Sequence, residues 1–158
     1  MATKKPHYIR LKTLTLEEAF GLMKEAVRTQ NKTTILDDVR VSVNPLDSLR
    51  LGTFLYRGIK CSHPGCLLRG AFFAVERPNS KSQINQFHLN LWAVNEFGQE
   101  ILMTCDHIIS RGLGGMNIIG NTQTMCSPHN SAKSVEEQRY LEALKKLEKR
   151  QLKNERVS

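Results

Sequence analysis

Two short-spaced pairs of metal-ligand side chains constrain the fold of this chain more than any other feature. Four residues separate Cys61 from Cys66, and two separate Cys126 from His129. Each pair is compact enough to lie on one turn, and three thiolates with one imidazole suit a closed tetrahedral zinc site. One ion bound by both pairs would close a segment of about 60 residues, which stabilises a fold much as a disulfide does. We therefore predict a structural zinc site that has no open position for chemistry.

Two further side chains compete for places in this site. Cys105 could replace His129 to give four cysteines, and His63 lies between the two cysteines of the first pair. Cys105 ends an apolar run that predicts a strand, where cysteine usually behaves as a small buried apolar residue. We keep His129 as the fourth ligand and Cys105 as the alternative. For the whole set, the other interpretation is ordinary buried thiols and a surface histidine.

The net charge favours an anionic partner. The chain has 23 Lys and Arg against 15 Asp and Glu, a formal charge of +8, and basic side chains release counterions when they bind the phosphates of a nucleic acid. Charge alone does not define the partner, because many basic proteins bind nucleic acid adventitiously. No run approaches the roughly 18 apolar residues that cross a bilayer, and the N-terminus lacks the apolar core of a signal peptide. We expect a cytoplasmic protein with no membrane partner, in a reducing compartment where clustered Cys and His favour metal over disulfides.

The first third of the chain predicts a basic arm, a helix and two extended segments. Residues 1–12 carry basic side chains and no acid, which is typical of an arm that orders on phosphate or of a solvated tail. Thr15 and Glu18 form a capping box, and apolar residues at helical spacing predict a helix over 15–30. Extended segments are predicted over 39–43 and 52–59.

The rest of the chain predicts strands followed by helix. Strand patterns cover 71–75, 87–94 and 100–108, and the last two flank a turn-like stretch that contains Gly98, which predicts a β-hairpin. A helix is expected to begin near Pro128. After Ser134, leucines at 141, 144 and 147 alternate with charged residues that are acidic early and basic late, and this pattern predicts a long amphipathic helix.

A fixed order of polar residues follows the last predicted strand. Asp106 and His107 end the strand, a glycine-rich loop follows, and Asn121 and Asn130 come next. Histidine is the commonest general base at neutral pH. Carboxylate and amide oxygens are hard ligands that suit Mg²⁺. A base and a hard cation are what the hydrolysis of a phosphodiester requires.

This ordered set resembles the motif of the HNH endonucleases, also called His-Me finger or ββα-metal nucleases. The resemblance covers residues 61–134 and is strongest from 101 to 134. It implies that Asp106 and Asn130 hold a catalytic Mg²⁺ or Mn²⁺, that His107 is the general base, and that Asn121 ties the loop so that the base is oriented. Many relatives have His at the last position, and an amide oxygen there favours Mg²⁺ or Mn²⁺.

The loop and its neighbours extend the resemblance. The glycines at 112, 114 and 115 match the family's glycine-containing loop. Arg111 and Lys133 match no catalytic role and are candidate phosphate contacts. Successive strand residues point to opposite faces, so Asp106 and His107 can share one site only if the strand ends or twists between them. We therefore predict irregular backbone at that point.

The resemblance implies an α+β fold. A ββα-metal core with a structural zinc knuckle would carry an N-terminal helix and strand extension and a long C-terminal helix. We divide the chain into 1–58, 59–134 and 135–158 accordingly. The expected activity is DNA endonuclease, by nicking or double-strand cleavage, as a monomer or homodimer, with RNA left open as a substrate.

Size and layout are similar to the small free-standing HNH proteins common in phage genomes, which would place the protein in the cytoplasm of a bacterial host. Two alternatives remain at this point. One is a non-catalytic zinc-containing module that binds nucleic acid. The other is an interaction protein that uses Leu141, Leu144 and Leu147 as a helix seam.

Overall fold

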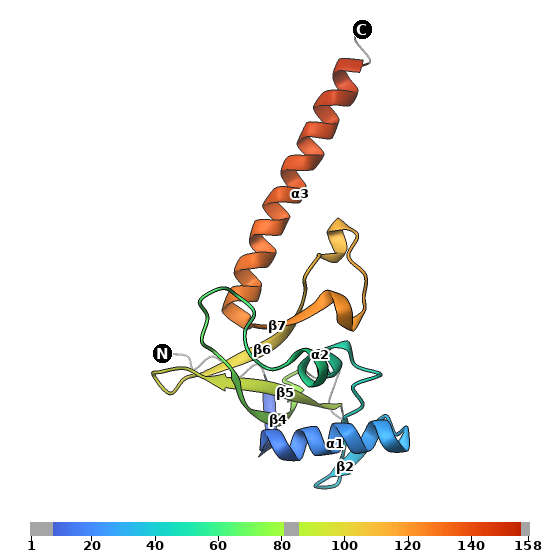
Figure 1. Ribbon diagram of the computed structural model, residues 1–158, viewed down its shortest axis with the longest axis vertical. Helices are drawn as coiled ribbons and strands as arrows, with labels where there is room; N and C mark the ends of the chain where they lie inside the picture. Colours follow the sequence, from blue (N-terminus) through green and yellow to red (C-terminus); the bar gives the residue numbers. More distant parts are fainter. Residues whose placement is uncertain (1–7, 81–85, 156–158) are drawn as a thin grey trace.

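The protein is a mixed α+β fold, described here from a computed structural model that covers residues 8–80 and 86–155. The expected α+β class is confirmed (Figure 1). In chain order the elements are β1 (Tyr8–Leu14), α1 (Leu16–Thr29), β2 (Thr33–Leu36), β3 (Val39–Ser42), α2 (Leu49–Arg57), β4 (Gly70–Pro78), β5 (Phe87–Val94), β6 (Glu100–His107), two 3-10 turns at Arg111–Leu113 and Ile119–Asn121, β7 (Thr122–Cys126) and α3 (Ser127–Glu155).

The seven strands form a curled sheet that divides at β5. One edge of β5 pairs with β4, which pairs in turn with β1. On its other edge, the start of β5 pairs with β3 in parallel, and its end pairs with the first residues of β6 in antiparallel fashion. Strand β6 then leaves β5 and pairs with β7. The β6–β7 pair therefore forms a lobe at one end of the sheet, joined to the rest by the buried side chains of Met103 and Met125, and α3 follows directly from it.

The hydrophobic core lies between one face of β4 and β5 and the helices α1 and α2. Phe73 of β4 is fully buried and contacts Phe20 of α1 and Phe54 of α2 edge-on, with ring centroids 5.6 and 6.1 Å apart. Edge-on packing matches the positive ring edge to the negative ring face. These contacts fix both helices to the sheet.

Helix α1 forms as its capping box predicts. Thr15 accepts a hydrogen bond from the Glu18 amide, and the Glu18 carboxylate accepts one from the Thr15 amide. The helix ends at Thr29, and the next residue, Gln30, caps it with a left-handed φ of 58°. The predicted strand at 39–43 and the predicted hairpin after residue 87 are also confirmed.

The predicted extended segment over 52–59 is wrong, because these residues belong mainly to helix α2. Ser48 caps the helix by accepting a hydrogen bond from the Leu51 amide. Leu51 and Phe54 then fall on one buried face. The run of Thr, Phe, Leu and Tyr has strand propensity, and burial of a helical face overrides it.

The predicted basic arm is wrong for residues 8–12, which are part of strand β1. Arg10 donates to Glu76 at 2.7 Å and to Glu100, and its guanidinium lies 5.1 Å from the centre of the Trp92 ring. Residues 1–7, with the rest of the expected arm, lie outside the described residues. Since β1 and β3 share a sheet with β4 and β5, strands from both sides of the 58/59 boundary pack together.

Helix α3 is continuous from Ser127 to Glu155, so it crosses the proposed boundary at 134/135. Only its first turns lie against β6 and β7, and the rest extends away from the sheet (Figure 1). Strand β7, just before it, was not predicted. Within the described ranges, no helix combines the length and the apolar character needed to span a membrane.

Candidate metal centre and the polar cluster at the base of α3

The structure brings both ligand pairs together. The ligand atoms of Cys61, Cys66, Cys126 and His129 all lie within 4.8 Å of one another. The Cys61 and Cys126 sulfurs are 3.7 Å apart, and the His129 Nδ1 lies 3.6 and 3.1 Å from them. Bonds of about 2.3 Å to sulfur and about 2.0 Å to nitrogen give tetrahedral edges of roughly 3.5–3.8 Å. The cluster therefore has the size of a zinc site.

Backbone hydrogen bonds shape the first ligand pair. The Cys61 amide donates to the Leu68 carbonyl at 2.9 Å, and the Cys66 amide donates to the His63 carbonyl at 3.0 Å. These bonds fold residues 61–68 into a tight knuckle. His63 is not one of the clustered ligands. Its ring stacks on the His129 ring at 3.9 Å and helps to hold that ligand in place.

Cys105 lies apart from the cluster. Its sulfur contacts the Thr53 hydroxyl of α2 at 3.3 Å, and burial raises the pKa of the thiol. Of the two arrangements left open by the sequence, the structure has the one with His129.

The thiols of Cys61 and Cys126 differ in acidity. Burial alone would raise the pKa of Cys61, but hydrogen bonds from backbone amides and neighbouring thiols outweigh it and lower that pKa. Burial, with the adjacent Cys61 and Cys66, raises the pKa of Cys126 to about 12. Because thiols bind a metal ion as thiolates, a cation has to displace the Cys126 proton on binding.

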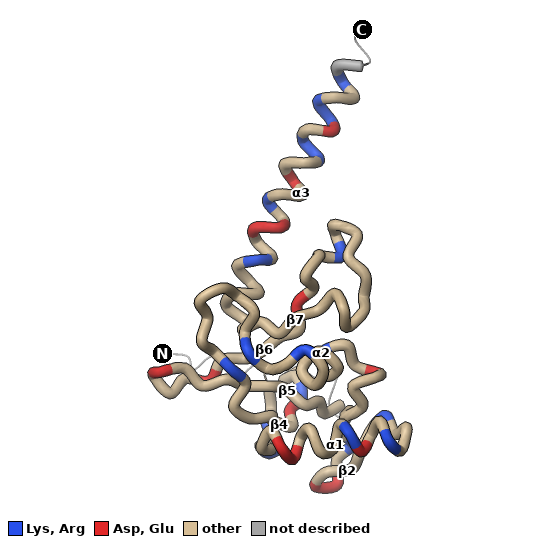
Figure 2. Tube along the Cα trace, in the orientation of Figure 1, with Lys and Arg blue, Asp and Glu red and all other residues tan. Residues whose placement is uncertain are grey.

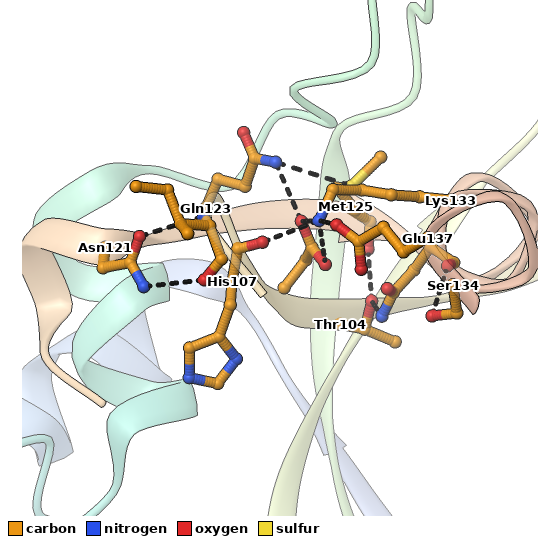
Figure 3. A network of polar contacts seen from close by, with 11 residues as sticks. Thr104, His107, Asn121, Gln123, Met125, Lys133, Ser134 and Glu137 are labelled. Carbon is orange, nitrogen blue, oxygen red and sulfur yellow. Dashed lines mark hydrogen bonds and ion pairs between the residues drawn. The ribbon is translucent and has the colours of Figure 1, made fainter. Parts of the chain in front are cut away.

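A second polar cluster surrounds Lys133, on the side of β6 that faces α3 (Figure 3). The Lys133 ammonium lies 3.1 Å from the Asp106 carboxylate, 2.7 Å from the His107 carbonyl oxygen and 2.8 Å from the Glu137 carboxylate. Burial opposes the charge, but hydrogen bonds to Glu137 and Asp106 outweigh it and raise the pKa of the lysine. Lys133 is thus bound within the cluster and does not present its ammonium outward as a phosphate contact.

Asp106 and Asn130 both belong to this α3 side. Asp106 is only 8% exposed and also accepts a hydrogen bond from Gln123 at 2.8 Å. The Asn130 amide nitrogen donates to the Thr104 hydroxyl at 2.8 Å, which leaves the amide oxygen available for another partner. Two oxygen donors of the kind Mg²⁺ prefers are therefore held on one face by β6 and α3.

The predicted irregular backbone between Asp106 and His107 is wrong. Strands β6 and β7 pair in unbroken register, with Asp106 opposite Gln123 and His107 opposite Thr122. Alternation then places the two side chains on opposite faces. Figure 3 shows the His107 imidazole pointing away from the Lys133 cluster, and its Nε2 lies 3.0 Å from the Asn117 amide oxygen. This geometry counts against one site shared by both side chains.

Asn121 ties the glycine-rich loop. Its amide oxygen accepts from the Ile109 amide, and its amide nitrogen donates to the carbonyls of Ile109 and Met116, at 2.9–3.0 Å. Gly115 is required there, because a Cβ would lie 1.8 Å from the Ile109 carbonyl oxygen. Arg111 is exposed on the same loop, with no ion pair among the described residues.

Two residues that sequence reasoning did not select belong to the Lys133 cluster. Glu137 lies four residues after Lys133, a spacing that brings opposite charges together on a helix. This signal was present in the sequence. Gln123 was not identifiable in this way, because its place depends on pairing between β6 and the unpredicted strand β7.

The fold and the cluster define an α+β protein with a candidate zinc site of three cysteines and one histidine. Comparison with protein-family models, with curated proteins and with solved structures finds no match to this chain.

Proposed function

We propose that this protein is a metal-dependent endonuclease of the HNH type that hydrolyses phosphodiester bonds in DNA. The observation that supports this most is the oxygen cage around Lys133. Asp106, Glu137 and the His107 carbonyl oxygen already surround a positive charge, as the oxygen ligands of a cation would. The β6–β7–α3 order of elements is the order that a ββα-metal core requires.

Asp106 and Asn130 fit a hard divalent cation, because both offer oxygen. Mg²⁺ or Mn²⁺ bound there would supply positive charge to a phosphate oxygen in the transition state. Glu137 is a third oxygen donor within reach of the same volume, since its carboxylate and that of Asp106 contact one ammonium. Lys133 has to withdraw when the divalent cation binds.

His107 is the proposed general base. Asn117 holds its Nε2, and Asn121 fixes the loop that carries Asn117. Catalytic hydrogen bonds often form only with substrate present. His107 is also the last residue of β6, so its side chain lies at the end of the strand pairing.

A zinc-containing nucleic-acid-binding module without catalysis is the second candidate. The regular pairing of Asp106 and His107 favours it, because their side chains lie on opposite faces. In this case the Lys133 cluster only joins α3 to β6. Both candidates keep the same structural zinc, formed by the four clustered ligands.

A plasmid-nicking assay with Mg²⁺ separates the two. We expect the parent to convert supercoiled plasmid to nicked or linear product, and His107→Ala to lose at least about 100-fold in rate, as is usual for a general base. Zinc content and melting temperature should match the parent, which controls for folding. A parent that binds plasmid without cutting it, in Mg²⁺ and in Mn²⁺, leaves the second candidate.

A further inference from the structure

The zinc knuckle and the end of α2 together form a basic cleft. It has a volume of about 670 Å³, and the end of α2 and residues 58–69 form most of its wall. Three cations line it: Arg57, Lys60 and Arg69. All three are exposed. Within the described part of the chain, no acid lines this cleft and none of the three forms an ion pair.

The placement of two of these cations costs stability. Lys60 and Arg69 are direct partners in an isolated antiparallel bridge, so their side chains leave the same side of it. Like charges directly opposite each other on paired strands are destabilising. No acid lines the cleft to offset this repulsion, and an anionic ligand bound there would offset it.

The cleft adjoins the strand pair that carries His107. The Arg57 Nε donates to the Thr122 carbonyl oxygen at 3.2 Å, and Thr122 is the residue opposite His107. The amide of Ser62 donates to the Thr124 carbonyl at 2.9 Å, so the knuckle lies along β7. Alternation puts His107 on the face of Thr122 and Thr124, whose hydroxyls contact Thr53 of α2 and the Gly58 carbonyl just after α2. The cations and the imidazole thus belong to one side of the lobe.

We propose that this cleft binds the sugar-phosphate backbone of DNA, with Arg57, Lys60 and Arg69 each contacting phosphate oxygens. The inference deepens the proposed nuclease function, on which it rests, because the cations lie on the same side of the β6–β7 pair as His107. Arginine presents a planar fork that suits two phosphate oxygens, while lysine acts as a point charge. The zinc cluster would keep the knuckle and its cations in position.

The outer part of α3 is the competing basic surface. Lysines and arginines are frequent there, but acidic residues interrupt them along the helix (Figure 2), whereas no acid is among the described residues that line the cleft. A convex isolated helix also offers no concavity for a strand. The cleft therefore fits a phosphate backbone better than α3 does.

The test is a salt series of DNA binding, measured by fluorescence anisotropy with a short labelled duplex. All proteins carry His107→Ala and no divalent cation is added, so cleavage plays no part. Lys60→Gln/Arg69→Gln is compared with Lys32→Gln/Arg40→Gln, a matched pair of exposed cations near and on the β2–β3 hairpin. Lys149→Gln/Arg150→Gln on α3 is the third arm.

The cleft variant loses two phosphate contacts. The slope of log association constant against log salt concentration should therefore become about 1.8 less steep, and binding should weaken roughly 30-fold at 0.15 M salt. The variants of the hairpin pair and of the α3 pair should keep a salt slope and an affinity close to those of the parent. The cleft variant should keep its zinc and melt no lower than the parent, because the repulsion between residues 60 and 69 is gone.

The proposal is overturned if the cleft variant keeps the parent's slope and affinity, or if the parent binds no duplex at low salt. It is also overturned if the α3 variant, and not the cleft variant, loses affinity for the duplex. The nuclease proposal stands or falls separately, by plasmid nicking. A parent that never cuts DNA, but whose cleft variant loses slope and affinity, upholds the cleft as a binding site.

Discussion

At the scale of single residues, the ammonium of Lys133 occupies the position that the proposed divalent cation would take. Asp106 and Glu137 both contact it, and Asp106 is buried. We predict that Lys133→Met frees these oxygens and tightens Mn²⁺ binding about tenfold, equivalent to about 1.4 kcal/mol. Isothermal titration calorimetry measures the change.

Lys133→Arg is the matched control, because it keeps the positive charge. Without a cation, Lys133→Met should also unfold about 1–3 kcal/mol more easily, since a buried carboxylate loses its partner. Equal Mn²⁺ affinity in all three proteins would show that Lys133 is a structural ion-pair partner and that no cation competes with it.

The zinc ligands allow a second prediction at this scale. Metal analysis should find close to one zinc per chain in the parent and in Cys105→Ser, and much less in His129→Ala. The reason is that His129 lies in the cluster while the Cys105 sulfur contacts Thr53. A chelator that removes the ion from the parent should lower stability by about 3 kcal/mol, as opening a loop-closing cross-link does. Zinc lost from Cys105→Ser and retained by His129→Ala would reverse the assignment.

His88 gives a prediction about pH. Burial, and then the charge of Arg50, lower the pKa of His88 in the folded protein. The unfolded chain then binds the proton more readily, so stability falls as pH drops through the unfolded value near 6.5 and below it. Urea unfolding between pH 7.5 and 5.5 should show this decline, and His88→Gln should flatten it. An equal slope in both proteins would mean that other groups cause the decline.

At the scale of elements, the sequence predicted what local chemistry determines. The capping box of α1 and the turn at Gly98 are signals contained in a few neighbouring residues, and both elements formed as expected. Helix α2 and strands β1 and β7 depend on partners far along the chain. Strand β1 is held by Arg10 against Glu76 and Glu100, which no local pattern reveals.

The candidate site also has some features that local sequence reveals and others that depend on distant partners. The four zinc ligands could be identified because their spacing in two short pairs carries the chemistry. The sequence could not show that Asp106 and His107 lie on opposite faces, because this follows from the register of β6 with β7. A pattern of residue types gives the order of side chains but not the direction in which each one points.

The loop between β6 and β7 allows a prediction at this scale. Gly115→Ala places a methyl group against the Ile109 backbone, and Asn121→Ala removes three hydrogen bonds. We expect either change to loosen the loop at a cost of about 2–3 kcal/mol. Amide hydrogen exchange should rise over residues 108–121 more than over β4 and β5. Gly120→Ala, where a Cβ meets nothing closer than 3.9 Å, is the control.

At the scale of the whole molecule, the outer part of α3 is an extension that the folded body does not need. The base of the helix carries His129, Lys133 and Glu137, which join it to the zinc cluster and to β6. Leu141 still meets the loop, since a Cβ at Gly112 would touch it. Beyond that point the apolar side chains are largely exposed, with Leu147 54% and Leu152 57% accessible. Exposed helix of this kind contributes little to stability.

Ending the chain at Leu144 should therefore leave the zinc content unchanged and the free energy of unfolding unchanged to within about 1 kcal/mol, because only solvated turns are removed. Ending it at Glu136 is the contrasting truncation, since it removes Glu137 and Leu141 and should destabilise the lobe. Differential scanning calorimetry and sedimentation velocity, run on the parent and both truncations, give stability and association together. The opposite outcome is that the chain ending at Leu144 is markedly destabilised and the parent sediments as a dimer. It would mean that Leu147 and Leu152 pack against a second copy of this chain.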